Sequence, residues 1–182
     1  KKIIQISSNV LEKKIINLSS KYTTPYNAKI ISKIIVRAEK MEILTHGLHY
    51  FLHSIVPHLV NGVTEHVVIK KDNIIYSEGK NGGGIGVMNI YKCLTKASKI
   101  AKRKGVCIYS AKNPGKVGAF RTYCPEIIKN DQLILMVKNT APTQGLKKVK
   151  KALIGTNPLA IGIPGTNFIC GSSTSTVATN SI

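Results

Sequence analysis

The chain has 182 residues, which is enough for one substantial hydrophobic core or two small lobes. Its formal net charge is +19, but only three of its 27 basic residues are arginine, the side chain that base-edge readers favour. Composition therefore disfavours specific nucleic-acid binding, and no apolar run reaches the length that a membrane span needs.

The spacing of the cysteines and the first residues of the chain indicate the cellular compartment of the protein. The four cysteines form no C-x-x-C pair and no framework typical of a small secreted domain: Cys93, Cys107, Cys124 and Cys170. Reduced thiols in an intracellular protein are predicted. The first residues lack the hydrophobic region of a signal peptide. We therefore expect a soluble, cytoplasmic protein that does not interact with membranes.

The first third of the chain is predicted to be helical. Apolar residues recur with helical periodicity in three segments, residues 9–19, 25–44 and 48–62. Ser7 or Ser8 can cap the first helix, and Pro25 is suited to open the second. The third is expected to bend or end near Pro57, because proline lacks the N–H that a helix interior requires.

Strands and helices alternate in the rest of the chain. Alternating and β-branched residues predict a strand pair at residues 65–70 and 74–77, turning at Asp72-Asn73. Further elements are expected in the order helix, strand, helix, strand at residues 87–104, 106–109, 116–128 and 133–138. A polar loop then leads to the turn at 155–158, followed by a short apolar strand that Pro164 stops. The fold class is α/β or α+β.

The glycine cluster at residues 82–86 has two interpretations. It lacks the G-K-[ST] ending of a phosphate-binding P-loop, and no G-x-G-x-x-G register fits it. A tight strand-to-helix turn with close backbone packing is the favoured alternative. The basic run at 147–151 is interpreted as a solvated loop, with attraction of cofactor phosphates as its second possible role.

Three histidines lie roughly on one predicted helical face: His46, His49 and His53. His49 and His53 have a spacing that can chelate zinc, but no carboxylate or thiol follows at a suitable distance, so we predict no metal site. His46 stands beside Gly47, a suitable place for an exposed, titratable imidazole. From the residues alone, a histidine without chemistry is the more probable interpretation.

Six segments, taken in order, resemble the malate/L-lactate dehydrogenase family, whose members are NAD(P)-dependent and lack a Rossmann domain. Residues 44–48 resemble its D-S-H-G motif, 77–86 its D-G-x-N-G-x-G segment, and 104–110 its helix-exit glycine and strand. Residues 139–142 are similar to its T-N-x-S-P loop, 153–164 to its following turn and strand, and 172–175 fall in its D-M-A-T-S motif. The resemblance runs from about Leu11 to the last residue.

The resemblance implies an architecture and a reaction. An N-terminal helical, substrate-binding part (residues 1–75) would pack with an incomplete NAD(P)-binding part (residues 76–182), whose sheet is mixed, largely antiparallel and flanked by helices. The chain would be a fragment of a longer, dimeric enzyme. Its activity would be hydride transfer between NAD or NADP and a small 2-hydroxy or 2-keto acid of the malate or lactate type.

The resemblance also implies site residues. His46 matches the family's proton donor and acceptor, and Thr45, Tyr50 and Asn113 would bind substrate. The predicted cofactor-binding residues are Thr140, Thr156, Asn157, Phe168, Ile169, Cys170, Gly171, Ser172 and Ser173.

Four positions depart from the family pattern. An aspartate is replaced by Leu44, an arginine by Tyr50, a histidine by Asn113 and the D-M-A-T-S aspartate by Gly171. Tyrosine cannot make the charged, bidentate carboxylate contact of arginine, and asparagine does not titrate. Three hypotheses therefore stay open: a dehydrogenase, a catalytically inactive remnant that keeps the fold, and a basic nucleic-acid-binding module. The substrate, the choice between NAD and NADP, and any extension beyond Ile182 also stay open.

Overall fold

The computed structural model describes residues 5–63, 65–145, 152–166 and 168–174. Contacts divide the chain into two compact units, residues 1–119 and 120–182, which are described one at a time. The boundary expected after residue 75 falls within a strand of the first unit, and a functional division at that point stays a prediction.

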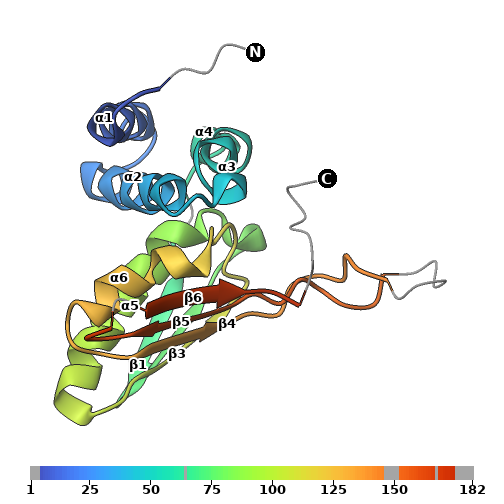
Figure 1. The fold of residues 1–182 in the computed structure, drawn as a ribbon. Coiled ribbons are helices and arrows are strands. Elements are labelled where there is room, and N and C mark those ends of the chain that lie inside the picture. The colour runs from blue at the N-terminus through green and yellow to red at the C-terminus, as the bar shows by residue number, and fades with distance from the viewer. Residues whose placement is uncertain (1–4, 64, 146–151, 167, 175–182) are drawn as a thin grey trace. The chain divides into compact units, whose positions relative to one another are not determined.

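Two long helices open the first unit (Figure 1). Helix α1 (Ser8–Ser19) is capped by Ser7, whose Oγ accepts a hydrogen bond from the Val10 N–H at 3.4 Å. Helix α2 (Pro25–Lys40) is capped by Thr24 and carries the buried, inward-facing residues that its periodicity predicted, Ile30, Ile31, Ile34, Ile35 and Ala38. It ends four residues earlier than expected, just before Glu42 adopts a φ of 57° that a helix cannot accommodate.

The predicted third helix is built from three pieces. A 3-10 turn, η1 (Leu44–His46), precedes α3 (Leu48–Tyr50), which continues into a π-helical turn, η2 (Phe51–Ile55), and then α4 (Val56–Val60). The π turn lies directly before Pro57, where the ordinary helical hydrogen-bond pattern has lost a donor. The helix changes its hydrogen-bond pattern beside this proline but continues through it to Val60.

A mixed three-stranded sheet completes the first unit. Strands β1 (Val67–Lys71) and β2 (Ile74–Glu78) form the predicted antiparallel hairpin, and β3 (Ile108–Lys112) lies parallel to β2. Helix α5 (Gly86–Lys104) connects β2 to β3, as parallel strands require. It covers one sheet face, where Ile75 packs against Cys93, Ala97 and Ile100.

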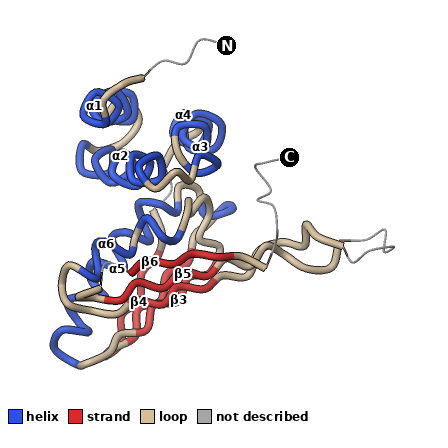
Figure 2. The backbone as a smooth tube through the Cα atoms, viewed as in Figure 1, coloured by secondary structure: helices blue, strands red, loops and turns tan. Residues whose placement is uncertain are grey.

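The second unit holds an antiparallel sheet with strand order β4-β5-β6 (Figure 2). Its strands are β4 (Ile134–Val137), β5 (Leu159–Ile163) and β6 (Phe168–Ser172). Three of the four strand pairings among the described residues are thus antiparallel, which matches the expected sheet character. A close contact joins β5 to α6 (Cys124–Ile128), because a Cβ at Gly162 would lie 2.9 Å from Cys124 Cβ.

One predicted element is wrong. The helix expected over residues 116–128 is reduced to a 3-10 turn, η4 (Phe120–Thr122), and the five-residue α6. Gly118 has a φ of 68°, a left-handed conformation that interrupts a right-handed helix. Within the described residues, no helix is both long and apolar enough to cross a membrane.

Candidate functional site

The predicted site residues fall into two groups. Thr45, His46, Tyr50 and Asn113 belong to the first unit, and all the predicted cofactor-binding residues belong to the second.

His46 lies next to a hydrogen bond between α2 and α3 that forms beside Gly47. The Glu39 carboxylate, near the end of α2, accepts a hydrogen bond from the Leu48 N–H and so satisfies a donor at the start of α3. A Cβ at Gly47 would lie only 2.0 Å from the Glu39 carboxylate oxygen, so any larger residue there would displace this carboxylate from the Leu48 N–H. Sequence reasoning missed Glu39, because its partner lies nine residues away across a helix end.

The His46 imidazole is half-buried and anchored at one nitrogen. Its Nδ1 lies 2.9 Å from Thr45 Oγ1, and its ring centroid is 5.3 Å from that of Tyr50. Burial lowers the pKa of His46 below its ordinary value, because desolvation disfavours the charged form. Nε2 forms no hydrogen bond with the residues that the structure describes. The ring is thus neutral at physiological pH and has one nitrogen left to exchange a proton.

Tyr50 is a core residue. It is 5% exposed, and its hydroxyl oxygen accepts a hydrogen bond from the Gly118 N–H at 3.1 Å. Burial raises the pKa of Tyr50 to about 12, although the hydrogen bond from Gly118 acts in the opposite direction. The phenol is therefore neutral and ties α3 to the segment that ends the first unit.

Asn113 belongs to a loop that packs on the glycine cluster. A Cβ at Gly83 would lie 2.0 Å from the Asn113 carbonyl oxygen, and a Cβ at Gly86 would lie 1.9 Å from that of Pro114. The Val87 N–H, in the first turn of α5, donates to the Lys116 carbonyl at 2.9 Å. The prediction of a tight turn with close backbone packing is confirmed.

His66 also holds this turn, and sequence reasoning did not single it out. Its Nε2 lies 2.9 Å from the Gly83 carbonyl oxygen, and the residue is 7% exposed. Because a carbonyl oxygen only accepts, Nε2 carries the proton. A single histidine in a β-branched run gives no sequence signal for such a contact.

In the second unit, three predicted cofactor-binding residues lie together. The Thr140 N–H donates to Asn157 Oδ1 at 3.0 Å, and the Asn157 N–H donates to Thr140 Oγ1 at 3.2 Å. Thr140 Oγ1 also lies 3.2 Å from Thr156 Oγ1. The bonds give the loop and the following turn one fixed arrangement. The ligand-binding role of these residues stays a prediction.

The end of β6 is joined to the same turn. The Thr174 hydroxyl donates to the Gly155 carbonyl at 3.1 Å, and its N–H donates to the Thr156 carbonyl at 2.9 Å. The predicted segment 168–173 therefore runs alongside β5 and finishes beside Thr156. Within it, Phe168, Cys170, Ser172 and Ser173 are exposed, whereas Ile169 and Gly171 are partly buried.

Gly171, where the resemblance places an aspartate, is covered by an arginine. A Cβ at this position would lie 2.4 Å from Arg121 Cγ and 2.8 Å from Arg121 Cδ. The aliphatic stem of Arg121 thus fills the space that a side chain at residue 171 would need. Gly171 cannot supply a carboxylate, so any contact with a ligand there would come from its backbone.

The donors and apolar surface of the second unit fit a dinucleotide. Asn157 uses its carbonyl oxygen internally, and its amide nitrogen forms no hydrogen bond with the described residues. Leu159, two residues after Asn157, exposes 40% of its surface and offers apolar area near these polar groups, whereas the 50% exposed Phe168 pairs with Ile163 at the other end of β5. Hydrogen-bond donors beside apolar surface are what a nicotinamide dinucleotide needs.

Two histidines of the predicted histidine face lie close together. The rings of His49 and His53 lie with their centroids 4.5 Å apart and their planes tilted by 39°. Across the described ranges, no group of three or more histidine, cysteine or acidic residues is arranged to hold a metal ion. The four cysteines are free thiols. The basic run at 147–151 lies outside the described residues.

The sequence matches a known protein family over most of its length. The family model for malate/L-lactate dehydrogenase matches residues 6–182. The chain is 28% identical over 159 residues to malate/(S)-sulfolactate dehydrogenase of Methanothermus fervidus, covering 84% of this chain and 45% of that protein. It is 25% identical over 183 residues to malate dehydrogenase of Pyrococcus abyssi, covering 96% and 49%.

Solved structures have the same fold. Malate dehydrogenase of Entamoeba histolytica superposes with a TM-score of 0.86 at 19% identity, covering 99% of this chain and 52% of that one. Malate dehydrogenase of Pyrococcus horikoshii gives a TM-score of 0.84 at 23% identity, covering 98% and 53%. The chain thus spans about half the length of the relatives it matches.

Proposed function

Because the chain belongs to the malate/L-lactate dehydrogenase family, we propose that it forms part of an NAD(P)-dependent oxidoreductase acting on small 2-hydroxy or 2-keto acids. Relatives named for malate and sulfolactate support a substrate that carries a second acidic group. Since the chain spans about half of each relative, the activity of the whole protein is part of this proposal.

The observation that carries the proposal is the state of His46. In the tautomer in which Nδ1–H donates to Thr45 Oγ1, the Nε2 lone pair is available to take the hydroxyl proton of a 2-hydroxy acid. The lowered pKa keeps the imidazole in the form that accepts a proton at neutral pH. In the reverse direction, His46 returns that proton to the oxygen of the 2-keto acid.

The second unit is proposed to hold the cofactor, which supplies or accepts the hydride when it is bound. Thr156 and the Asn157 amide nitrogen would donate hydrogen bonds to it, with Thr140 fixing both residues. The segment 168–173 would offer backbone groups and the exposed Phe168 ring. Both NAD and NADP are compatible with these groups.

A second candidate function, a catalytically weak or inactive remnant, is favoured by Tyr50 and Gly171. Tyr50 is buried, with its hydroxyl already accepting from Gly118, and it carries no charge for a substrate carboxylate. Thr45 and Asn113 are the other proposed substrate contacts, and neither is charged. We therefore expect slow turnover, together with cofactor binding that survives.

Titration of NADH and NADPH, followed by their fluorescence, tests the cofactor assignment. We expect saturable binding that weakens roughly tenfold in Asn157→Ala, because a fixed donor and its loop bonds are lost. Asn130→Ala, a change of the same kind at the end of α6, is expected to leave the affinity unchanged. No saturable binding, or equal weakening in both variants, would contradict the assignment.

A further inference from the structure

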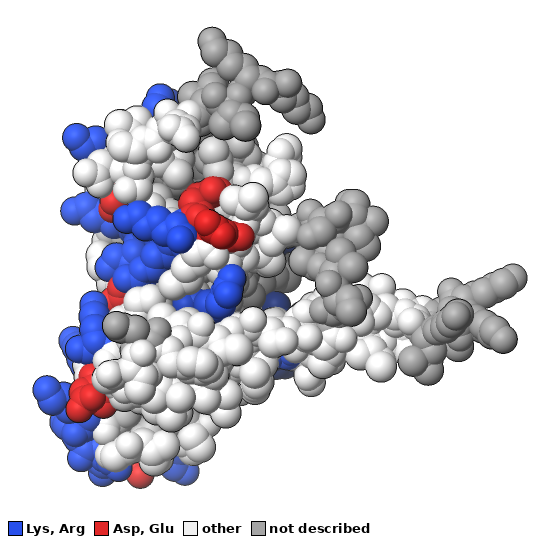
Figure 3. Space-filling view, viewed as in Figure 1, with Lys and Arg blue, Asp and Glu red and all other residues white. Residues whose placement is uncertain are grey.

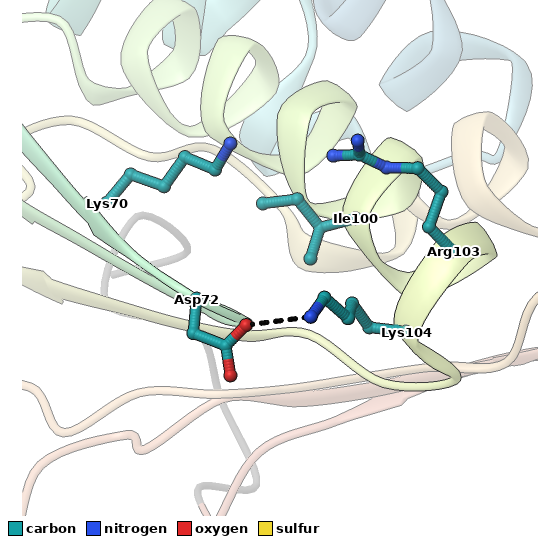
Figure 4. A pocket seen from close by; sticks show the side chains of 5 residues that line it. All are labelled: Lys70, Asp72, Ile100, Arg103 and Lys104. Atoms are coloured by element: carbon teal, nitrogen blue, oxygen red, sulfur yellow. Dashed lines mark ion pairs between the residues drawn. The ribbon is translucent and has the colours of Figure 1, made fainter.

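A cationic pocket lies between β1 and the last turns of α5, and none of its lining residues belongs to the candidate site. It has a volume of about 420 Å³ and is lined by Lys70, Asp72, Ile100, Arg103 and Lys104 (Figure 4). Three of the five lining side chains are positively charged and one is negatively charged. The lining is therefore suited to an anion.

Only one of the three cations in the pocket forms an ion pair with a described residue. Lys104 Nζ lies 3.1 Å from the Asp72 carboxylate. Lys70 and Arg103 form no ion pair or hydrogen bond with any residue in the part of the chain that the structure describes. Figure 4 shows the head groups of Lys70 and Arg103 on the same side of the pocket, with Ile100 between them. Two unpaired cations facing a common space repel one another unless an anion lies between them.

The helix dipole of α5 explains why some of these cations lie here, but not all of them. Lys102, Arg103 and Lys104 occupy the last turn of α5, where cations are stabilised by the helix dipole. Lys70 comes from a strand and gains nothing from that dipole. It pairs in register with Ile75, so its side chain projects on the sheet face that α5 covers, whereas Lys71 projects on the opposite face.

The pocket has ample volume for a compact anion. Figure 3 shows that Lys and Arg outnumber Asp and Glu on the visible face, so a diffuse attraction for anions is general to the surface. What distinguishes this pocket is a guanidinium fork and an ammonium group above an apolar floor, a combination suited to phosphate oxygens. The Asp72 carboxylate at the rim disfavours an extended phosphodiester backbone, because it would repel the neighbouring phosphates.

We propose that Lys70, Arg103 and Lys104 form a binding site for a small phosphate-bearing anion of the pyrophosphate class. Lys70 and Arg103 bind the phosphate oxygens directly, and Lys104 shares its charge between the ligand and Asp72. The proposal does not depend on the dehydrogenase assignment.

Cys107 provides a local reporter. It packs against the cluster that contains Ile100, and the thiol is partly buried. Burial raises the pKa of Cys107, while the positive charge of Lys70 acts in the opposite direction. An anion bound at Lys70 removes that effect and slows alkylation of the thiol. Cys170, an exposed thiol of the second unit, serves as the internal control.

The test is a calorimetric titration of the full chain with inorganic pyrophosphate, at an ionic strength held constant with potassium chloride. We expect saturable binding that weakens at least tenfold in both Lys70→Gln and Arg103→Gln. Lys71→Gln removes the same charge from the opposite face of β1 and is expected to change the affinity less than twofold. Asp72→Asn is expected to tighten binding. Circular dichroism verifies that each variant is folded.

Alkylation followed by mass spectrometry gives a second readout. Pyrophosphate is expected to slow modification of Cys107 at least twofold, to leave Cys170 unchanged, and to have no effect on Cys107 in Lys70→Gln. Equal weakening in Lys71→Gln and Lys70→Gln would show general charge attraction and overturn the proposal. It would also be overturned by an absence of saturable binding, or by a single-stranded oligonucleotide that binds at this site in preference to pyrophosphate.

Discussion

At the residue scale, His46 depends on neighbours that have no titratable role. Thr45 anchors Nδ1, and Gly47 leaves space for the Glu39 carboxylate that caps α3. The histidine and the glycine could be singled out from the sequence, because they are adjacent and their residue types are distinctive. Glu39 could not, since its contact depends on the angle at which α2 and α3 meet.

The burial of His46 predicts how stability varies with pH. Its folded-state pKa lies below the ordinary value of 6.5, so between these two values the unfolded chain binds the additional proton. The free energy of unfolding should therefore fall as the pH is lowered below about 6.5. Urea unfolding between pH 5 and 8 measures this, with His46→Gln as the variant in which the dependence should weaken.

Proton NMR titration of the imidazole provides the direct check. A His46 pKa at or above 6.5 would contradict the burial argument and remove the reason for a neutral base.

At the element scale, two glycines in the strand-to-helix turn before α5 are required for different physical reasons. Gly82 and Gly83 have nearly equal φ angles, 77° and 78°, in the left-handed region. A Cβ at Gly82 would meet nothing within 4 Å, whereas one at Gly83 would lie 2.0 Å from the Asn113 carbonyl oxygen. Conformation is therefore the common requirement, and close packing is specific to Gly83.

Alanine substitutions separate the two effects. Gly82→Ala should destabilise the fold by about 1–2 kcal/mol, the cost of a left-handed conformation in a residue with a Cβ. Gly83→Ala should cost roughly 2–5 kcal/mol, because the loop at Asn113 must also move. Chemical denaturation of both variants measures the difference. Equal losses would contradict the packing role of Gly83.

Prediction from sequence succeeded where local signals agreed and failed where a turn intervened. Periodicity and a capping residue located α1 and α2, and alternation located the β1–β2 hairpin. The prediction of a long helix over residues 116–128 was wrong. The apolar residues there have helical periodicity, but Gly118 adopts a left-handed conformation that interrupts a helix. Pairing of β2 with β3 in parallel could not be derived from either strand alone, since it depends on the crossover through α5.

At the scale of the whole molecule, the charge of +19 is dominated by lysine. Dispersed lysines attract phosphate backbones but read no sequence. We expect weak duplex DNA binding without sequence preference, lost as salt rises to physiological levels. Fluorescence anisotropy with two unrelated duplexes tests this. Tight binding that persists above physiological salt and distinguishes the duplexes would favour the nucleic-acid hypothesis instead.

The candidate site could be predicted only in part. Thr140, Thr156 and Asn157 form a hydrogen-bonded network, and their role in cofactor binding stays a prediction. Two substitutions have structural consequences that residue types alone did not reveal. The Tyr50 hydroxyl accepts a hydrogen bond from the Gly118 N–H, and the Arg121 side chain covers Gly171. Both facts depend on packing between segments far apart in the sequence.

Tyr50 and Gly171 also determine how fast we expect hydride transfer to be. Losing a charged contact to the substrate carboxylate typically removes about 1.5–3 kcal/mol of binding. If that contact is made in the transition state, hydride transfer slows by roughly one to two orders of magnitude. The absence of a carboxylate at Gly171 should slow it further, although such effects need not add.

The most direct test of the account is hydride transfer itself, followed as NAD(P)H absorbance with a panel of 2-hydroxy and 2-keto acids. We predict very slow turnover by the parent chain, abolished in His46→Ala and retained in His49→Ala, which alters an exposed histidine on the following turn. Turnover that survives His46→Ala would contradict the assignment of His46 as the acid/base. Equal, near-zero signals in the parent and His46→Ala, at high protein concentration, would contradict the dehydrogenase proposal and favour the inactive remnant.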